Sequence, residues 1–103
     1  MQHIVLTDRS DAFAVIARTA RSQAAVMTLA PGEDTGEPRE SEHPEADQWL
    51  FVLSGTGEAS GEGWQQPLEP GSLLLIAAGE GHRIRATGAA PLRTVNIDAP
   101  PHS

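Results

Sequence analysis

Short apolar runs, each followed by turn-forming residues, recur along this chain. The clearest run spans residues 49–53 (WLFVL). It is rich in aromatic and β-branched side chains and leads into the turn-prone residues 54–57 (SGTG). Residues 73–76 (LLLI) and 22–29 (SQAAVMTL) form two further apolar stretches of similar length. Runs of this length and composition, bounded by turn signals, predict β-strands.

Weaker patterns predict further strands and one loop. We expect strands at residues 64–68, 83–86 and 92–97, and another that carries Glu58 and Ala59. Residues 11–19 fit either a strand or a short helix, because their alanine content blurs the periodicity. Residues 33–47 hold half of the 14 carboxylates, so we expect most of this segment to be a solvated loop. Short strands separated by frequent turns are typical of a sandwich or barrel, so the fold class is all-β.

Length and composition indicate one folded domain. The chain has 103 residues, of which 39% are hydrophobic and 20% are charged. This balance suits a globular domain rather than a disordered segment. The sequence has no internal repeat and no change of composition along its length. We therefore expect a single domain over residues 1–103.

The charge and cysteine counts exclude several classes of partner and site. Fourteen carboxylates stand against seven Arg and no Lys, giving a net charge of −7 that disfavours binding to nucleic acid or to anionic membranes. The chain has no cysteine and therefore no disulfide or thiolate site. It has no apolar stretch near the ~18 residues that span a bilayer, and the residues after Met1 do not resemble a signal peptide. We expect a cytoplasmic protein.

The histidines are the first candidates for chemistry. His3 and His102 lie near the two ends of the chain, where side chains are usually solvated. His43 and His82 instead lie at turns beside the two most apolar strands. Their spacing alone is consistent with hydrogen-bonded surface residues or with ligands of a shared site.

Two segments around these histidines resemble the two sequence motifs of the cupin superfamily. Residues 43–55 resemble the first motif, which has two His one residue apart, then a Glu, then a Gly at the end of the strand. Residues 70–82 resemble the part of the second motif that runs from its first Gly to its His. His43 and His82 match motif histidines, whereas Ser41 and Gln48 occupy the positions of the other His and of the Glu. Ala77 and Ala86 also depart from the second motif, at its Pro and its terminal Asn.

The resemblance implies a small single-domain cupin, of the conserved-barrel cupin 2 type, with a double-stranded β-helix or jelly-roll barrel. It also implies a divalent metal ion (Zn, Ni, Fe or Mn) held by His43, Gln48 and His82. We expect the metal to bind weakly, because two imidazoles and an amide supply no negative charge. Some cupins related to phosphomannose isomerase use a Gln ligand, so Gln48 is compatible with a metal site. Glu42 should face away from His43 by strand alternation unless a bulge turns it inward.

Three functions follow from this reading. The first is a small-molecule-binding cupin, with a metal-assisted reaction of the dioxygenase, isomerase or decarboxylase type as one form of it. The second is a non-catalytic binding or sensing barrel without a metal. The third is a metal-independent enzyme in which His43 or His82 acts as general acid or base. We expect the side chains of His43 and His82 to converge inside the barrel, whether or not a metal is bound.

Strand alternation also predicts what lies outside the barrel. If Gln48, Leu50 and Val52 point inward, then Trp49, Phe51 and Leu53 point outward and form a bulky apolar face. A protein of this size rarely leaves such a face in water, so we expect a homodimer. By the same alternation Arg83 and Arg85 should lie outside, in solvent or paired with acidic residues.

Overall fold

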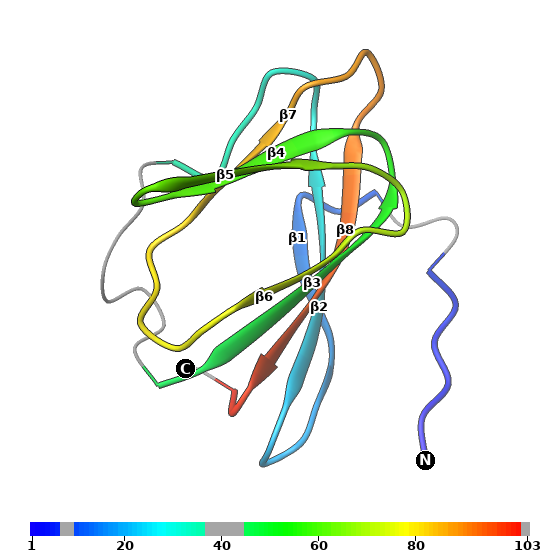
Figure 1. Cartoon of the computed structure of the whole chain (residues 1–103). Helices are drawn as coiled ribbons and strands as arrows, with labels where there is room; N and C mark the ends of the chain where they lie inside the picture. Colours follow the sequence, from blue (N-terminus) through cyan, green and yellow to red (C-terminus); the bar gives the residue numbers. More distant parts are fainter. Residues whose placement is uncertain (7–9, 37–44, 102–103) are drawn as a thin grey trace.

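The computed structural model describes residues 1–6, 10–36 and 45–101. This part of the chain contains eight β-strands (Figure 1). They are β1 (Phe13–Arg18), β2 (Gln23–Leu29), β3 (Asp47–Ser54), β4 (Gly57–Gly61), β5 (Trp64–Leu68), β6 (Leu73–Ile76), β7 (Arg83–Ala86) and β8 (Leu92–Ala99). The predicted all-β class is confirmed.

The strands form two antiparallel sheets. The larger sheet has the order β1-β2-β8-β3-β6, and the smaller has the order β5-β4-β7. The chain passes from the larger sheet to the smaller between β3 and β4, returns between β5 and β6, and crosses again on either side of β7 (Figure 1). Gly55, with φ of 82°, makes the first of these crossings, and an added Cβ there would collide with the backbone of Pro91 and Leu92.

The observed strands agree with the predicted ones, with differences at their ends. β6 and β7 have the predicted bounds, and the ambiguous segment at residues 11–19 forms the strand β1. β3 begins two residues earlier than the apolar run, at Asp47, and β8 extends two residues beyond Ile97. The longer β8 places Asp98 within the larger sheet, which the sequence pattern did not predict.

The hydrophobic core lies between the facing surfaces of the two sheets. Along β3, Leu50 and Val52 are buried, whereas Trp49 and Phe51 are exposed on the other side of the sheet. This is the alternation expected of a strand with one buried face. Trp64 is partly buried and packs against the core. The buried residues that form the core are Met27, Leu29, Leu50, Val52, Ala59, Leu68, Ile84, Ala86 and Leu92.

The acidic segment that follows β2 is not simply a solvated loop. Thr35 N donates to the carbonyl of Ile84 at 2.9 Å, and Ala86 N donates to the carbonyl of Glu33 at 2.9 Å, so this segment pairs with β7. Asp34 also forms a 2.9 Å ion pair with Arg83. The backbone N–H of Gly36, together with the Arg83 guanidinium, holds the pKa of Asp34 below its usual value.

The ion pair confirms the predicted outward placement of Arg83. Arg85 is exposed on the same side of β7, opposite the buried Ile84 and Ala86. Glu33 and Thr35 are exposed, as expected of a solvated loop, but the pairing of residues 33–35 with β7 was not predicted. Their carboxylate and backbone groups find partners on β7, which composition alone does not show.

Candidate functional site

A cavity of about 160 Å³ lies between the two sheets. Its walls combine apolar side chains with a small number of polar ones, which is typical of small-molecule sites. Five lining residues come from the larger sheet, namely Phe13, Met27, Gln48, Leu50 and Asn96. The other three, Thr35, His82 and Ile84, come from β7 and the segments beside it.

Gln48 supplies an unpartnered acceptor to this cavity. It lies near the start of β3, on the same face as Leu50 and Val52, and is only 8% exposed. Its side-chain Oε1 is buried and has no hydrogen-bond partner among the described residues. Leaving a buried acceptor unpaired costs on the order of 1–3 kcal/mol, so such an atom calls for an explanation. A ligand or cation in the cavity would provide one.

His82 reaches the cavity from the opposite side. It is half-buried and directly precedes β7. Its Nδ1 lies 3.4 Å from the carbonyl oxygen of Glu80, at the long end of hydrogen-bond distances. A carbonyl can only accept, so in this contact Nδ1 carries the proton, and in the neutral ring Nε2 then keeps a lone pair. A backbone carbonyl bonded to one imidazole nitrogen is a common way to orient the other nitrogen toward a metal or ligand.

Asn96 adds a polar group beside Gln48. It lies on the inner face of β8, directly across from Leu50. The buried hydroxyl of Thr94 donates to Asn96 Oδ1 at 2.8 Å. Because the oxygen accepts this bond, the nitrogen end of the Asn96 amide is left as a donor. The polar side chains that line the cavity therefore include an acceptor, a donor and an imidazole.

The structure brings together two of the three predicted metal ligands. Gln48 and His82 line the same cavity, as strand alternation predicted. His43 lies outside the described residues, as do Ser41 and Glu42, so the convergence of His43 with His82 stays a prediction. Within residues 1–6, 10–36 and 45–101, no three His, Cys, Asp or Glu side chains are grouped so as to hold a metal.

Buried polar residues near this end of the sheet were missed by the sequence analysis. Gln23 and Asp98, each 4% exposed, lie in register with each other across β2 and β8. Asp98 is also directly across from Gln48. The alternation of Leu92, Thr94, Asn96 and Asp98 along β8 could have indicated a common inward face, had the strand been extended beyond residue 97.

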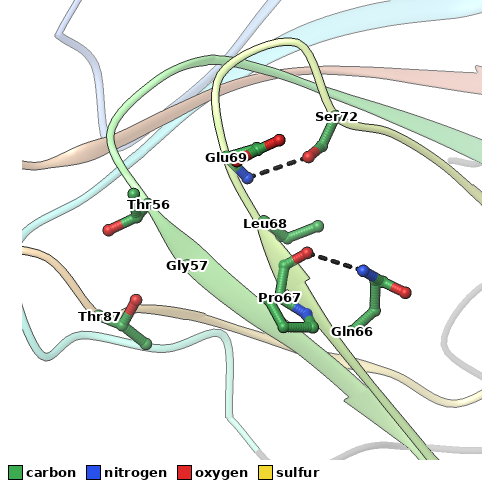
Figure 2. Close-up of a pocket in the computed structure, with 8 residues that line it drawn as sticks. All are labelled: Thr56, Gly57, Gln66, Pro67, Leu68, Glu69, Ser72 and Thr87. Atoms are coloured by element: carbon green, nitrogen blue, oxygen red, sulfur yellow. Dashed lines mark hydrogen bonds between the residues drawn. The ribbon is translucent and has the colours of Figure 1, made fainter.

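A second, larger hollow lies near the other end of β3 and β6. Its volume is about 480 Å³, and Figure 2 shows the eight residues that line it, Thr56, Gly57, Gln66, Pro67, Leu68, Glu69, Ser72 and Thr87. Several of its polar groups bond to each other: Ser72 Oγ accepts from Glu69 N, and Gln66 Nε2 donates to the carbonyl of Pro67, both at 3.0 Å. It contains no histidine, so despite its size we place the candidate site in the cavity between the sheets.

Comparison with known proteins identifies the family of this barrel. A family model described as the cupin domain matches residues 25–98, which run from within β2 to within β8. The chain belongs to the cupin family. The resemblance of the two motifs to those of cupins, and the jelly-roll barrel that it implied, are thereby confirmed.

Individual relatives support the same assignment. The chain is 34% identical over 69 residues to the tetracenomycin polyketide synthase protein TcmJ of Streptomyces glaucescens, covering 67% of this chain and 44% of that protein. This cupin thus spans less than half of that relative. A Bacillus halodurans protein of known structure is 28% identical, with a TM-score of 0.83 over 93% of this chain and 75% of its own. An RmlC-like cupin from Desulfovibrio desulfuricans, 20% identical, has a TM-score of 0.84 and covers 99% of both chains.

One further feature concerns membranes. In the part of the chain that the structure describes, no helix is long and apolar enough to cross a bilayer.

Proposed function

We propose that this cupin binds a small organic molecule in the cavity between its sheets, with Gln48 and His82 at the polar end. One observation carries the proposal. Gln48 Oε1 is buried without a partner among the described residues, in the same cavity as the imidazole of His82. A bound molecule that donates a hydrogen bond, or a bound cation, would satisfy this oxygen and offset its desolvation.

The volume and lining of the cavity constrain the ligand. A volume of about 160 Å³ has room for about five water molecules at about 30 Å³ each. Pockets for drug-sized ligands are larger, at about 300–1,000 Å³. We therefore propose a ligand smaller than a polycyclic polyketide, although the Streptomyces relative is named for polyketide synthesis. The apolar walls at Met27, Leu50 and Ile84 favour a ligand with a hydrocarbon part and one polar end.

We also propose that a divalent metal ion (Zn, Ni, Fe or Mn) binds weakly at this polar end, held by His43, Gln48 and His82. The described donors fit such an ion in kind: a buried amide oxygen without a partner, and an imidazole whose Nε2 has a free lone pair. When bound, the ion would act as a Lewis acid on an oxygen of the ligand. The protein would then be an enzyme of the dioxygenase, isomerase or decarboxylase type.

A non-catalytic binding or sensing barrel is the second candidate function. It is favoured by the absence, in the described ranges, of three grouped side chains of the types that usually hold a metal. In this case Gln48, Asn96 and His82 would contact the ligand directly through hydrogen bonds. Metal binding distinguishes the two candidates. Calorimetric titration of Ni²⁺ into untagged, chelator-treated protein would find one bound ion per chain only in the first.

The binding proposal can be tested by NMR with small aromatic acids. Benzoate and salicylate would each be titrated into labelled protein, with and without Zn²⁺. We expect shifts of the Met27 and Ile84 methyl groups and of the Gln48 side-chain amide. The exposed Met1 methyl and the Gln66 amide, which lines the other hollow, are the matched controls. Shifts confined to Met1 or Gln66 would contradict the proposal. It would also be contradicted if none of a wider set of small acids and amides shifted the Met27, Ile84 or Gln48 signals.

We propose, finally, that the protein forms a homodimer through the outer face of the larger sheet. Trp49 pairs across the strands with Leu75, and Phe51 pairs with Leu73. All four side chains are at least 40% exposed, and together they form an outer patch. Leu53, which was also expected here, is half-buried. A second copy related by a two-fold axis would cover this outer patch with the same residues of its own.

A further inference from the structure

The eight side chains that line the cavity between the sheets differ in their exposure to solvent. Five of them are at most 8% exposed and form its closed part, namely Met27, Gln48, Leu50, Ile84 and Asn96. Phe13 lines the same cavity but is 56% exposed. Thr35 is also exposed, and His82 is half-buried. The cavity therefore opens to solvent beside these three residues.

Phe13 is held at this opening by the pairing of β1 with β2. It is the first residue of β1, which is an edge strand of the larger sheet. In the register of the two strands it lies directly across from Met27, so the two side chains share the inner face. The backbone beside it is fixed, because Thr28 N donates to the carbonyl of Ala12 at 3.1 Å. The Phe13 ring is therefore a built part of the cavity wall.

This ring offers an aromatic surface to whatever occupies the cavity. The chain has four aromatic residues, all within the described ranges. Trp49 and Phe51 lie on the outer face of the larger sheet and Trp64 packs against the core, so Phe13 alone among them lines this cavity. An aromatic side chain has about 150–250 Å² to bury, so an exposure of 56% leaves on the order of 100 Å² in water. A ligand at the opening would cover part of that surface.

We propose that Phe13 determines the specificity of the cavity by selecting a planar aromatic ligand that stacks on its ring, an inference that rests on the proposed binding of a small molecule. Two aromatic rings in offset or edge-to-face contact gain free energy beyond the area that they bury, which a saturated ring of similar size does not gain. The thioether of Met27, directly across from Phe13, adds a sulfur that makes favourable contacts with ring edges.

The polar groups in the closed part of the cavity constrain the substituent on that ring. Gln48 Oε1 is an acceptor without a partner among the described residues, and the amide nitrogen of Asn96 is a donor. A primary carboxamide donates and accepts hydrogen bonds and carries no charge, so it matches this pair. A volume of about 160 Å³, below the range of pockets for drug-sized ligands, favours one small ring. The ligand class is a single aromatic ring with a neutral substituent that both donates and accepts.

The first test is an NMR titration with benzamide and with cyclohexanecarboxamide, which carries the same amide on a saturated ring. Binding to chelator-treated protein would be followed through the Met27 and Ile84 methyl groups. Wild type should bind benzamide about two- to tenfold more tightly than cyclohexanecarboxamide, which is the gain expected from one aromatic pair. Phe13→Leu should bind the two amides with affinities within about twofold of each other. Phe51→Leu, the matched control, makes the same change on the outer face and should keep the wild-type preference.

The outcomes separate this inference from the function on which it rests. If wild type binds both amides equally well in the cavity, or if Phe13→Leu keeps the preference for benzamide, only the role of Phe13 is wrong. The same follows if Phe51→Leu loses the preference as Phe13→Leu does. If neither amide nor any other small acid or amide shifts the cavity signals, the proposed binding fails and the role of Phe13 fails with it.

A second measurement on the wild-type protein does not depend on the folding of any variant. Nuclear Overhauser effects report protons that lie close together. We expect them between the ring protons of bound benzamide and the ring protons of Phe13, and none between benzamide and Phe51. Effects to the Met27 methyl group without any to Phe13 would show that benzamide binds in the cavity away from the Phe13 ring, and would overturn the inference.

Discussion

Replacing Gln48 with methionine should stabilise the metal-free protein. The Gln48 side chain is 8% exposed, and its Oε1 is buried without a partner among the described residues. An unsatisfied buried acceptor costs about 1–3 kcal/mol, and Met has a similar length without the polar atoms. The free energy of unfolding of Gln48→Met should therefore rise by about 1–3 kcal/mol. For a domain of this size, each kcal/mol corresponds to about 4–8 °C in Tm.

The matched control is Asn96→Leu, a polar-to-apolar change on the same inner face. Asn96 differs from Gln48 because its Oδ1 accepts a 2.8 Å hydrogen bond from the fully buried Thr94 hydroxyl. Its removal leaves that hydroxyl without its acceptor, so the variant should lose about 1–3 kcal/mol. Both variants would be measured by urea unfolding after chelator treatment, followed by circular dichroism. If Gln48→Met is destabilised like Asn96→Leu, then Gln48 stabilises the fold. The inference that its Oε1 is an unsatisfied acceptor would then be wrong.

Three further predictions concern the dimer, the Asp34–Arg83 ion pair and the charge of the metal site. Light scattering should give twice the chain mass of 10.9 kDa, and Phe51→Glu should give the monomer mass; a monomeric wild type at high concentration would contradict the dimer. The folded-state pKa of Asp34 is lowered, first by the hydrogen bond from Gly36 N and then by Arg83, so the ionised side chain should stabilise the protein above the usual Asp pKa. The difference in unfolding midpoint between wild type and Asp34→Asn should then vanish as pH falls through the folded pKa, and a difference that persists in acid would refute this. Gln48→Glu should bind Ni²⁺ more tightly than wild type, by calorimetry, because it adds an anionic ligand; equal affinities would contradict a neutral site.

Strand positions were predictable because the apolar runs and the turn residues indicate the same strand ends along most of this sequence. The run at residues 73–76 and the strand at residues 83–86 were located to the residue. Alternation from the WLFVL run also placed Gln48 on the inner face, where the structure has it. These features depend on local sequence and on which face of a strand is buried. The order of apolar and polar residues in a single sequence indicates both.

Features that depend on tertiary pairing were not predictable in the same way. β8 extends to Ala99 because its last residues pair with β2 on one side and β3 on the other. The sequence did not predict this extension, because those residues are largely polar and add no apolar run. Asp98 was therefore missed. The acidic segment after β2 pairs with β7 through backbone hydrogen bonds and an Arg83–Asp34 ion pair, both of which join residues 49 or more positions apart. Composition indicated only that this segment is charged.

The most direct test of the central claim is calorimetric titration of Ni²⁺ into untagged wild type and His82→Ala. The claim is that Gln48 and His82 form one binding site at the polar end of the inter-sheet cavity. His3→Ala serves as the control, since it removes an exposed imidazole near the N-terminus. We predict weak binding of one ion per chain in wild type and in His3→Ala, and loss of that binding in His82→Ala. Equal binding by wild type and His82→Ala would contradict the account.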